Sequence, residues 1–429
     1  MSWTSCATRS RTTDLTIMFH KSPPCVGMVS NAYYPLDPRI RRQAEALVTH
    51  GYQVEVLCQR QPGEPAEETV SGVHVRRIGG LKYCGRSLRS YLQSNVGFFL
   101  RAFIALAQAQ IQHGYVAVQV YSMPEALLLT ALFPRALGVP LIYDAGDLTA
   151  ELYACKFGAR GGRVVAVLLR AQERICLRLA DLIVTVHEEY RRRLLARGVP
   201  EHRLHVTMNL PDLQLIETAL RRRVRSDPNT FTLVHHGSLV ERYGSDLAVR
   251  AVARLRDRIP SLRLRIYGDG DLRPRLCALI DELAIGDRVI LDPAGMVQLE
   301  DLLPRLAAAD AAIVPHRAGA FTDTVLPNKL LEYLALGLPT VVTRTRTVAW
   351  HIPEDTVEYC PPNDVDAMAS AIERLWAQPS YRHSLATRAR VFSQLHSWNE
   401  AAAEYCLAID GLVSSQSATV PVSSASAWR

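Results

Sequence analysis

The sequence predicts an α/β fold with two doubly wound, Rossmann-like domains that face each other across a cleft. Short runs of apolar, often β-branched residues alternate with amphipathic helical stretches in both halves of the 429-residue chain. Strands that alternate with helices in this way form parallel sheets with right-handed crossovers. The alternation pauses after residues 204–208 and restarts at Phe231. Each half is therefore expected to build its own sheet and core.

In the first half, a strand is predicted at residues 25–30. A loop then leads into a helix that continues to His50 and is closed by Gly51, because glycine readily adopts the left-handed conformation that ends many helices. The other strands of this half are expected at residues 53–58, 73–75, 116–121, 140–144, 181–187 and 204–208.

The second half repeats the pattern. Its strands are expected at residues 231–238, 262–267, 289–292, 311–315 and 340–343. The predicted organisation is a disordered leader (1–20), a first domain (21–212), an interdomain linker (213–230), a second domain (231–394), a helix that packs back on the first domain (395–412) and a disordered tail (413–429).

The composition indicates a soluble globular protein, with 48% apolar and 21% charged residues. The nine cysteines are scattered and include no Cys-x-x-Cys pair, which predicts reduced thiols and no metal site. No apolar run reaches the roughly 18 residues of a membrane span. We therefore expect a cytoplasmic protein.

The net charge of +7 is unevenly distributed, and the basic half is expected to face an anionic surface. Residues 1–225 contain 29 Lys and Arg against 18 Asp and Glu, whereas residues 226–429 contain 20 against 24. Nucleic acid is disfavoured as a partner, since no helix-turn-helix, zinc-finger or stacking-aromatic pattern is present.

An anionic membrane fits the basic half better, with the protein peripheral on the cytoplasmic face. Residues 81–92 and 156–163 carry basic side chains interleaved with aromatic ones, and residues 98–103 are largely apolar. This mixture is typical of interfacial surfaces. The alternative for residues 98–103 is the core of a long helix.

Residues 323–339 are the stretch around which the second half is organised. Pro327 suits the first turn of a helix, and Gly337 suits the residue just past its end. The helix N-terminus attracts anions such as phosphate. A carboxylate one turn further in, Glu332, could accept hydrogen bonds from a ribose diol.

Helical periodicity puts the leucines of this helix on one side and leaves Asn328, Lys329 and Glu332 on the other. The alternative is a solvated Lys–Glu pair on a surface helix. The chain contains only four lysines among its 49 basic residues, and Lys329 is the last of them. This scarcity favours a specific role.

The carboxyl ends of parallel strands carry the ligands of doubly wound sheets. The candidate loops all fall at such ends: they follow Ser30 and Asp144 in the first half, and Gly237 and Tyr267 in the second. The helix from Pro327 begins at the same edge.

Four motifs of the second half resemble the donor domain of the family 4 glycosyltransferases, which are retaining enzymes of the GT-B fold. They are His-Gly-Ser-Leu at 236–239 with Tyr-Gly at 243–244, Leu-Arg-Ile-Tyr-Gly-Asp-Gly at 264–270, Ala-Asp-Ala-Ala-Ile-Val-Pro at 309–315, and Pro-Asn-Lys-x-x-Glu-Tyr-x-Ala-x-Gly-x-Pro at 327–339. The first half resembles the family's acceptor domain at 37–44, 143–148, 180–186 and 209. The similarity runs from about residue 26 to residue 412.

The resemblance implies roles for several residues of this helix and the turn before it. Glu332 matches the second acid of the family's Glu-x7-Glu motif, which holds the nucleotide ribose. Thr324 stands where the first acid is expected. Asp323 and the backbone N–H groups of Val325 and Leu326 are the expected replacements toward the donor sugar.

The family's basic residues on the diphosphate would fall near Ser238 and Tyr243, and neither is basic. We expect Arg242 and Lys329 to replace them, because a departing nucleoside diphosphate needs compensating charge.

In the first half, Gly146 occupies the place of a common histidine. Asp144 or Asp147 would then orient the acceptor.

The predicted catalytic residues are Arg242, Lys329, Glu332, Asp144 and Asp147. The predicted donor-binding residues are Gly237, Ser238, Tyr267, Gly268, Gly270, Asp323, Thr324, Val325, Leu326 and Asn328. The predicted acceptor-side residues are Asn31, Asp37 and Arg39.

The function implied is a retaining, metal-independent glycosyltransferase without a cofactor. It would move a sugar from a UDP- or GDP-sugar to a glycan or lipid-linked acceptor in surface polysaccharide or glycolipid synthesis. Two alternatives stay open: a catalytically silent GT-B subunit that positions a partner transferase, which the departures from the family pattern favour, and a sugar-nucleotide epimerase.

Overall fold

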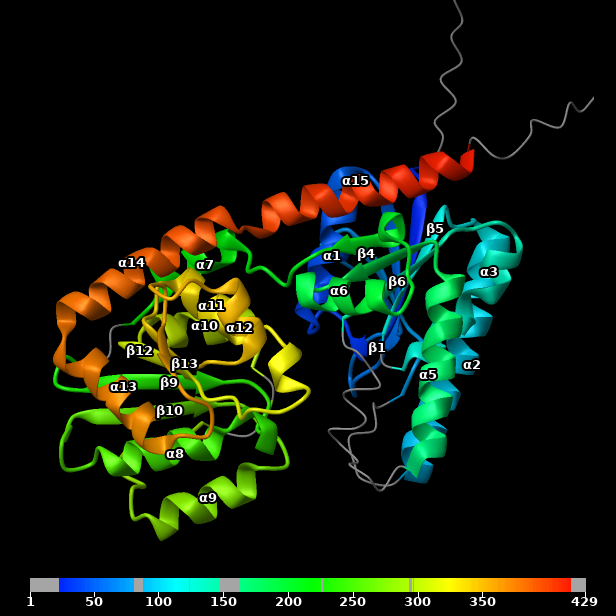
Figure 1. Cartoon of the computed structure of the whole chain (residues 1–429). Coiled ribbons are helices and arrows are strands. Elements are labelled where there is room, and N and C mark those ends of the chain that lie inside the picture. Colours follow the sequence, from blue (N-terminus) through cyan, green and yellow to red (C-terminus); the bar gives the residue numbers. More distant parts are fainter. Residues whose placement is uncertain are drawn as a thin grey trace, which may run out of the picture.

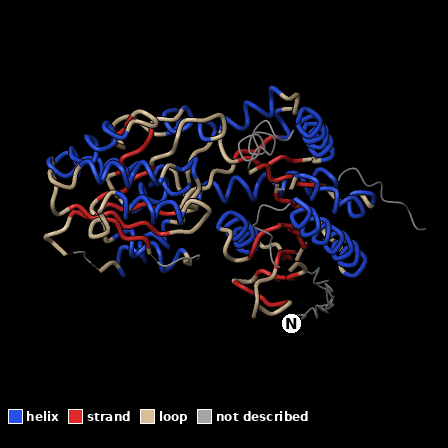
Figure 2. Tube along the Cα trace, turned by 90° about the horizontal axis from the view of Figure 1, so that it is seen from below, coloured by secondary structure: helices blue, strands red, loops and turns tan. Residues whose placement is uncertain are grey.

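A computed structural model describes residues 23–80, 88–122, 124–146, 162–224, 227–292, 295 and 297–417. The chain forms two α/β domains, each with helices on both faces of a sheet (Figures 1 and 2). This confirms the predicted fold class.

The first domain is built on an eight-stranded sheet in the order β3-β4-β2-β1-β5-β6-β7-β8. Every neighbouring pair is parallel except β3 with β4. The strands are β1 (Cys25–Tyr33), β2 (Gln53–Gln59), β3 (Glu67–Val70), β4 (Val73–Arg77), β5 (Ala117–Tyr121), β6 (Leu141–Ala145), β7 (Leu182–Thr185) and β8 (Leu204–Val206).

Alternation along the strands explains how this sheet carries two layers of helices. Val26 and Met28 of β1 pack toward α1 and α15, whereas Val29 packs toward α2. The helices are α1 (Pro38–His50), α2 (Leu88–Gln112), α3 (Leu132–Ala136), α5 (Gly162–Leu179) and α6 (Glu188–Ala196), with short 3-10 turns η1 (Glu125–Ala131) and η3 (Glu201–Arg203). Gly51 ends α1 in the left-handed conformation, as predicted.

The second domain has a wholly parallel sheet in the order β11-β10-β9-β12-β13-β14. Its strands are β9 (Phe231–His236), β10 (Leu262–Tyr267), β11 (Val289–Leu291), β12 (Ala311–Val314), β13 (Thr340–Thr343) and β14 (Glu358–Cys360). Its helical segments are α7 (Leu213–Arg222), η4 (Glu241–Tyr243), α8 (Ser245–Arg254), α9 (Arg273–Glu282), α10 (Leu299–Ala307), η5 (Thr322–Thr324), α11 (Asn328–Leu336), α12 (Arg346–His351), α13 (Val365–Ala377) and α14 (Pro379–Leu395).

Three features differ from the sequence-based expectation. The antiparallel edge strand β3 and the edge strand β14 were not anticipated. The segment expected as a linker begins with α7, whose Ile216 and Ala219 are buried in the core of the second domain. This apolar face therefore makes α7 part of that domain.

The C-terminal helix α15 (Trp398–Ser417) crosses from the second domain to the first, where it packs on α1 (Figure 1). The buried hydroxyl of Tyr405 donates to Gln119 Oε1 at 2.5 Å, and Tyr52 donates to Asp410 at 2.6 Å. The ion pairs Arg41–Glu300 and Arg346–Glu189 also join the two domains. In the described part of the chain, no helix is both long and apolar enough to cross a membrane.

Replacing Tyr405 by Phe should destabilise the protein, because Gln119 Oε1 would lose its donor inside the core. An unsatisfied buried acceptor costs about 1–3 kcal/mol, which should appear as a lower urea midpoint. Tyr52→Phe is the matched control, because Tyr52 also makes a hydrogen bond between the first domain and α15. Its partner Asp410 also faces His50 at 2.8 Å and is exposed, so the loss should be smaller. Equal losses in both variants would contradict this role of the Gln119 contact.

Candidate active site at the domain interface

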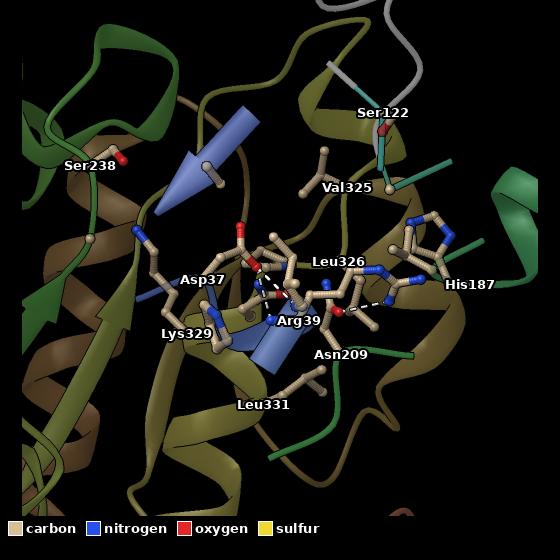
Figure 3. A pocket seen from close by; sticks show the side chains of 18 of the residues that line it. Asp37, Arg39, Ser122, His187, Asn209, Ser238, Val325, Leu326, Lys329 and Leu331 are labelled. Atoms are coloured by element: carbon tan, nitrogen blue, oxygen red, sulfur yellow. Dashed lines mark hydrogen bonds between the residues drawn. The ribbon is translucent and has the colours of Figure 1, made fainter. Parts of the chain in front are cut away.

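A cavity of about 490 Å³ opens between the two domains. Strands of both sheets end at it. Asn31 lies near the end of β1 and Ser122 follows β5, while Gly237 follows β9 and His316 lies just beyond β12. In each sheet these two strands are neighbours at the point where the strand order reverses, which is where doubly wound folds bind ligands. Figure 3 shows Asp37, Arg39 and Asn209 of the first domain opposite Ser238 and Lys329 of the second.

Lys329 dominates the second-domain wall. It lies in the first turn of α11, and its side chain runs along the turn after β9. A Cβ atom on Gly237 would lie 3.0 Å from Lys329 Nζ, and Gly237 has a φ of +111°. Glycine therefore supplies both the left-handed turn and the space for the lysine.

The ammonium of Lys329 is buried without a partner. Only 9% of the residue is exposed, and Nζ has no hydrogen-bond acceptor among the described residues. Burial lowers the pKa of Lys329 to about 8, although Glu332 partly offsets this. The sequence placed Lys329 on the polar side of the helix, with a solvated Lys–Glu pair as the alternative. That side faces the cavity, and the turn at Gly237 covers the lysine.

Glu332 is held beside His236. The backbone N–H of His236 donates to the Tyr333 hydroxyl oxygen at 2.9 Å, and Nδ1 of the same ring lies 2.8 Å from that oxygen. Nε2 of the ring lies 2.8 Å from Glu332 Oε2. The imidazole thus packs against the carboxylate at the cavity edge.

Tyr243 and His316 form a stacked aromatic pair beside Lys329. Their ring centroids lie 4.7 Å apart with an interplanar angle of 19°. Lys329 Nζ lies 5.0 Å from the Tyr243 centroid. The guanidinium of Arg242 lies over the rings of Tyr243 and Phe321, at 4.8 and 5.5 Å.

Arg39 dominates the first-domain wall. Its Nε donates to Asp144 at 2.9 Å, and its Nη1 donates to the Thr207 carbonyl at 2.7 Å and to Asn209 Oδ1 at 2.8 Å. Gln43 also donates to Asp144, at 3.0 Å. Within the described structure, Arg39 Nη2 is buried without a partner. Asp144 thus orients Arg39 and leaves the two N–H groups of Nη2 for another partner.

The other predicted acceptor-side residues also line the cavity, with local structural roles. Asp37 caps α1 by accepting the N–H groups of Arg39 and Ile40. Asn31 accepts a hydrogen bond from Gln59 at 2.6 Å and donates to Asn95 at 2.7 Å.

Comparison with known proteins identifies the family. Residues 36–209 match the model of a glycosyl transferase 4-like domain, and residues 230–378 match that of the glycosyl transferases group 1. The chain belongs to the family 4 glycosyltransferases, as the sequence motifs predicted.

Two relatives and two solved structures place this family 4 chain among its neighbours. It is 33% identical over 153 residues to the lipopolysaccharide core biosynthesis glycosyltransferase LpsE of Rhizobium meliloti, covering 35% of this chain and 41% of LpsE. It is 31% identical over 177 residues to a GDP-mannose-dependent phosphatidylinositol dimannoside mannosyltransferase of Mycobacterium tuberculosis, covering 41% of this chain and 43% of the relative. The matched segments thus span less than half of each relative.

The solved structures share the fold. Sucrose-phosphate synthase of Thermosynechococcus elongatus has a TM-score of 0.70 at 20% identity, covering 91% of this chain and 100% of that one. Anabaena HepE in complex with UDP-glucose has a TM-score of 0.66 at 14% identity, covering 90% and 99%.

Most of the predicted site residues of this family 4 member line the cavity. They are Asn31, Asp37, Arg39, Asp144, Gly237, Ser238, Val325, Leu326, Asn328, Lys329 and Glu332. Asp147 lies outside the described residues. The N–H of Val325 already donates to the Thr322 carbonyl at 3.3 Å, so it is not free for a donor sugar.

Some predicted donor-binding residues lie behind the cavity wall instead, and the structure corrects their placement. A Cβ on Gly268 would lie 2.0 Å from the Gly237 carbonyl oxygen, and one on Gly270 would lie 2.5 Å from that of Leu239. These glycines therefore permit close backbone packing. Tyr267 is buried in the core, and Thr324 is buried with its hydroxyl donating to the Phe321 carbonyl.

Arg242 and Asp323 are also outside the set of described residues that line the cavity. Arg242 stands behind Tyr243, and the backbone carbonyl of Asp323 accepts a hydrogen bond from Thr347.

The sequence analysis missed His236 and His316, together with His187 and Tyr190 of the first domain, which also line the cavity. Each of two of these histidines lies at the carboxyl end of a strand: His236 ends β9, and His316 follows β12. This position could point to the cavity only once the strand order was known.

Lys329→Met should stabilise the fold, because it removes a buried, unpaired charge. The depressed pKa means that the penalty is fully present below about pH 8 and fades as the pH approaches the ordinary lysine value of 10.5. At neutral pH the free energy of unfolding should rise by about 1–3 kcal/mol. Urea titrations over a pH series should show the difference narrowing above about pH 8. A variant no more stable than the wild type at neutral pH would mean that the ammonium is solvated.

Proposed function

We propose that this chain is a retaining glycosyltransferase that moves a sugar from a nucleotide-sugar to a glycan or lipid-linked acceptor. The observation that carries the proposal is the shared cavity, with an unpartnered buried ammonium in its second-domain wall. Relatives named for lipopolysaccharide core biosynthesis and for GDP-mannose-dependent mannosyl transfer support surface glycan or glycolipid synthesis as its setting.

The second domain would hold the donor. The diphosphate would bind at the N-terminus of α11, where Lys329 and the first backbone N–H groups of the helix offer positive charge. The ribose diol would donate to Glu332, one helical turn further on. Arg242 would act from behind Tyr243 through its charge, without direct contact.

The first domain would hold the acceptor. Arg39 Nη2 is a buried donor that faces no acceptor among the described residues, and it needs a polar partner from a ligand or water. Asp144 would serve by fixing Arg39. Contact of Asp147 with the acceptor stays a prediction.

Retention would follow from a front-face displacement. The acceptor hydroxyl attacks the anomeric carbon from the side on which the nucleoside diphosphate leaves, and the departing phosphate takes its proton. Catalysis then depends on positioning and on charge stabilisation. Lys329 supplies that charge, so no step of this scheme uses a metal ion.

The direct test is donor hydrolysis. A panel of UDP- and GDP-sugars is incubated with the protein without acceptor, and release of UDP or GDP is measured with and without EDTA. Slow release from one donor, unaffected by EDTA, is expected. Absence of both binding and release for every donor would favour the silent-subunit alternative.

Glu332→Ala should lower kcat/KM for that donor, because the ribose hydroxyls lose their hydrogen-bond acceptor. The expected loss is about 2–4 kcal/mol of transition-state stabilisation. Glu332→Gln should be intermediate. Glu282→Gln, on an exposed position of α9, is the matched control. Wild-type kcat/KM in the alanine variant would remove Glu332 from the site.

We also propose that the first domain docks on an anionic membrane through an apolar-and-basic face formed by α2 and α5. These helices both pack on η1, at the end of the molecule away from the second domain (Figure 1). The exposed apolar residues of this face are Val96, Leu100, Ile104, Ile111, Val167, Leu168 and Ile175.

The charge of this face suits anionic lipid. Arg101, Arg170, Arg174 and Arg178 are exposed on the same helices. The sequence of α2 contains no acidic residue, and the only one in α5, Glu173, is buried against Arg197. Basic residues interleaved with apolar ones favour an anionic interface.

The details differ from the sequence-based expectation. Phe98 and Ala102 belong to the core, as the alternative reading of residues 98–103 held, whereas Leu100 is 55% exposed. Lys82, Arg86 and residues 156–161 lie outside the described residues.

Liposome flotation tests the docking face. Co-flotation should grow with anionic lipid content and fade with salt. It should drop when Leu100 and Ile104 become Gln, and also when Arg170 and Arg174 become Gln. Arg254→Gln, at an exposed position of α8 in the second domain, should float like the wild type. Protein that stays soluble with strongly anionic liposomes at low salt would contradict docking.

A further inference from the structure

His316 is a buried imidazole of the cavity wall whose hydrogen-bonding capacity is unused. It is 3% exposed, and neither ring nitrogen has a partner in the part of the chain that the structure describes. Nearby His235 is also buried, but its Nδ1 lies 3.0 Å from the Ile313 carbonyl and its Nε2 lies 3.0 Å from Ser245 Oγ. Buried polar groups are nearly always satisfied. His235 is thus a structural histidine, whereas His316 awaits a partner from a ligand or solvent.

The groups around His316 keep it neutral in the free protein. Burial, the ammonium of Lys329 on α11 and the guanidinium of Arg242 on η4 hold its pKa well below the ordinary value of 6.5. The other titratable neighbours, Tyr243 stacked on it and His235 of β9, bring no negative charge at neutral pH. A neutral imidazole and an unpaired ammonium therefore flank the Tyr243 ring.

A ligand that binds both His316 and Lys329 must be an anion with several acceptor oxygens. A sugar hydroxyl could bond the imidazole, but it would leave the ammonium uncompensated. A diphosphate offers acceptors to both groups and compensates the charge of the ammonium. Resting on the proposed function, we propose that His316 binds the diphosphate of the nucleotide-sugar donor and takes up a proton as it does so.

The affinity for the sugar nucleotide should depend on pH in one direction. Burial and the positive charges of Lys329 and Arg242 keep the proton off His316 in the free protein. The negative charge of the diphosphate favours the protonated imidazole, so binding raises the pKa of His316. Affinity then increases as the pH falls, by up to about tenfold per pH unit for one proton. Lys329 contributes to proton uptake on binding in a separate pH range. Its free pKa of about 8 means that it takes up a proton on binding only near and above that pH.

Calorimetry in paired buffers of different ionisation enthalpy measures this uptake directly. UDP-glucose and GDP-mannose serve as probes without acceptor, since their diphosphate diesters do not titrate where histidine does. At about pH 6 the wild type should take up protons on binding. His316→Gln and His316→Phe should abolish that uptake and bind about tenfold more weakly there, with the difference narrowing toward pH 8. The Phe variant keeps an aromatic ring stacked on Tyr243. If both variants lose affinity and proton uptake alike, the effect belongs to the imidazole nitrogens.

His383→Gln, at an exposed position of α14, should match the wild type. Binding without proton uptake at about pH 6, or uptake that survives in both His316 variants, would overturn this inference and leave the proposed function standing. A folded wild type that binds neither sugar nucleotides nor inorganic pyrophosphate would overturn both.

Discussion

The site depends on one costly feature, the burial of the Lys329 ammonium with no hydrogen-bonded carboxylate among the described residues. The lysine can lie there only because Gly237 has no side chain, and Gly237 can adopt its turn only because Gly268 lets the next strand's loop approach its carbonyl. Two glycines that are separated in the sequence thus make room for one charged atom. A fold selected for stability alone would place an apolar residue at this position.

A continuous chain of buried hydrogen bonds holds the first-domain wall of the cavity in place. Tyr405 of α15 donates to Gln119, Gln119 donates to Gln43, and Gln43 donates to Asp144, which holds Arg39. The C-terminal helix is therefore physically linked to the cavity that Asp144 and Arg39 line. Each member satisfies the next, so the network keeps Arg39 in one orientation.

Sequence periodicity located most strands and the α11 helix, because burial on one or both faces leaves a local pattern. It failed where distant segments meet. The polar side of α11 was predicted but the burial of Lys329 was not, since nothing near it in the chain shows that the turn after β9 covers it. Gly268 and Gly270 occupy loops typical of ligand contacts, yet they serve backbone packing. His316 became visible only when the strand order placed β12 beside β9.

If a nucleotide-sugar neutralises the buried ammonium of Lys329, binding should change the pKa of this lysine. Because the chain has only four lysines, an NMR pH titration of protein labelled with 13C at lysine Cε can resolve each one, with Lys329→Met assigning its signal. We expect a Lys329 pKa of about 8 in the free protein and a clearly higher value with a bound sugar nucleotide. A Lys329 pKa near 10.5 that does not move on binding would contradict this role of Lys329.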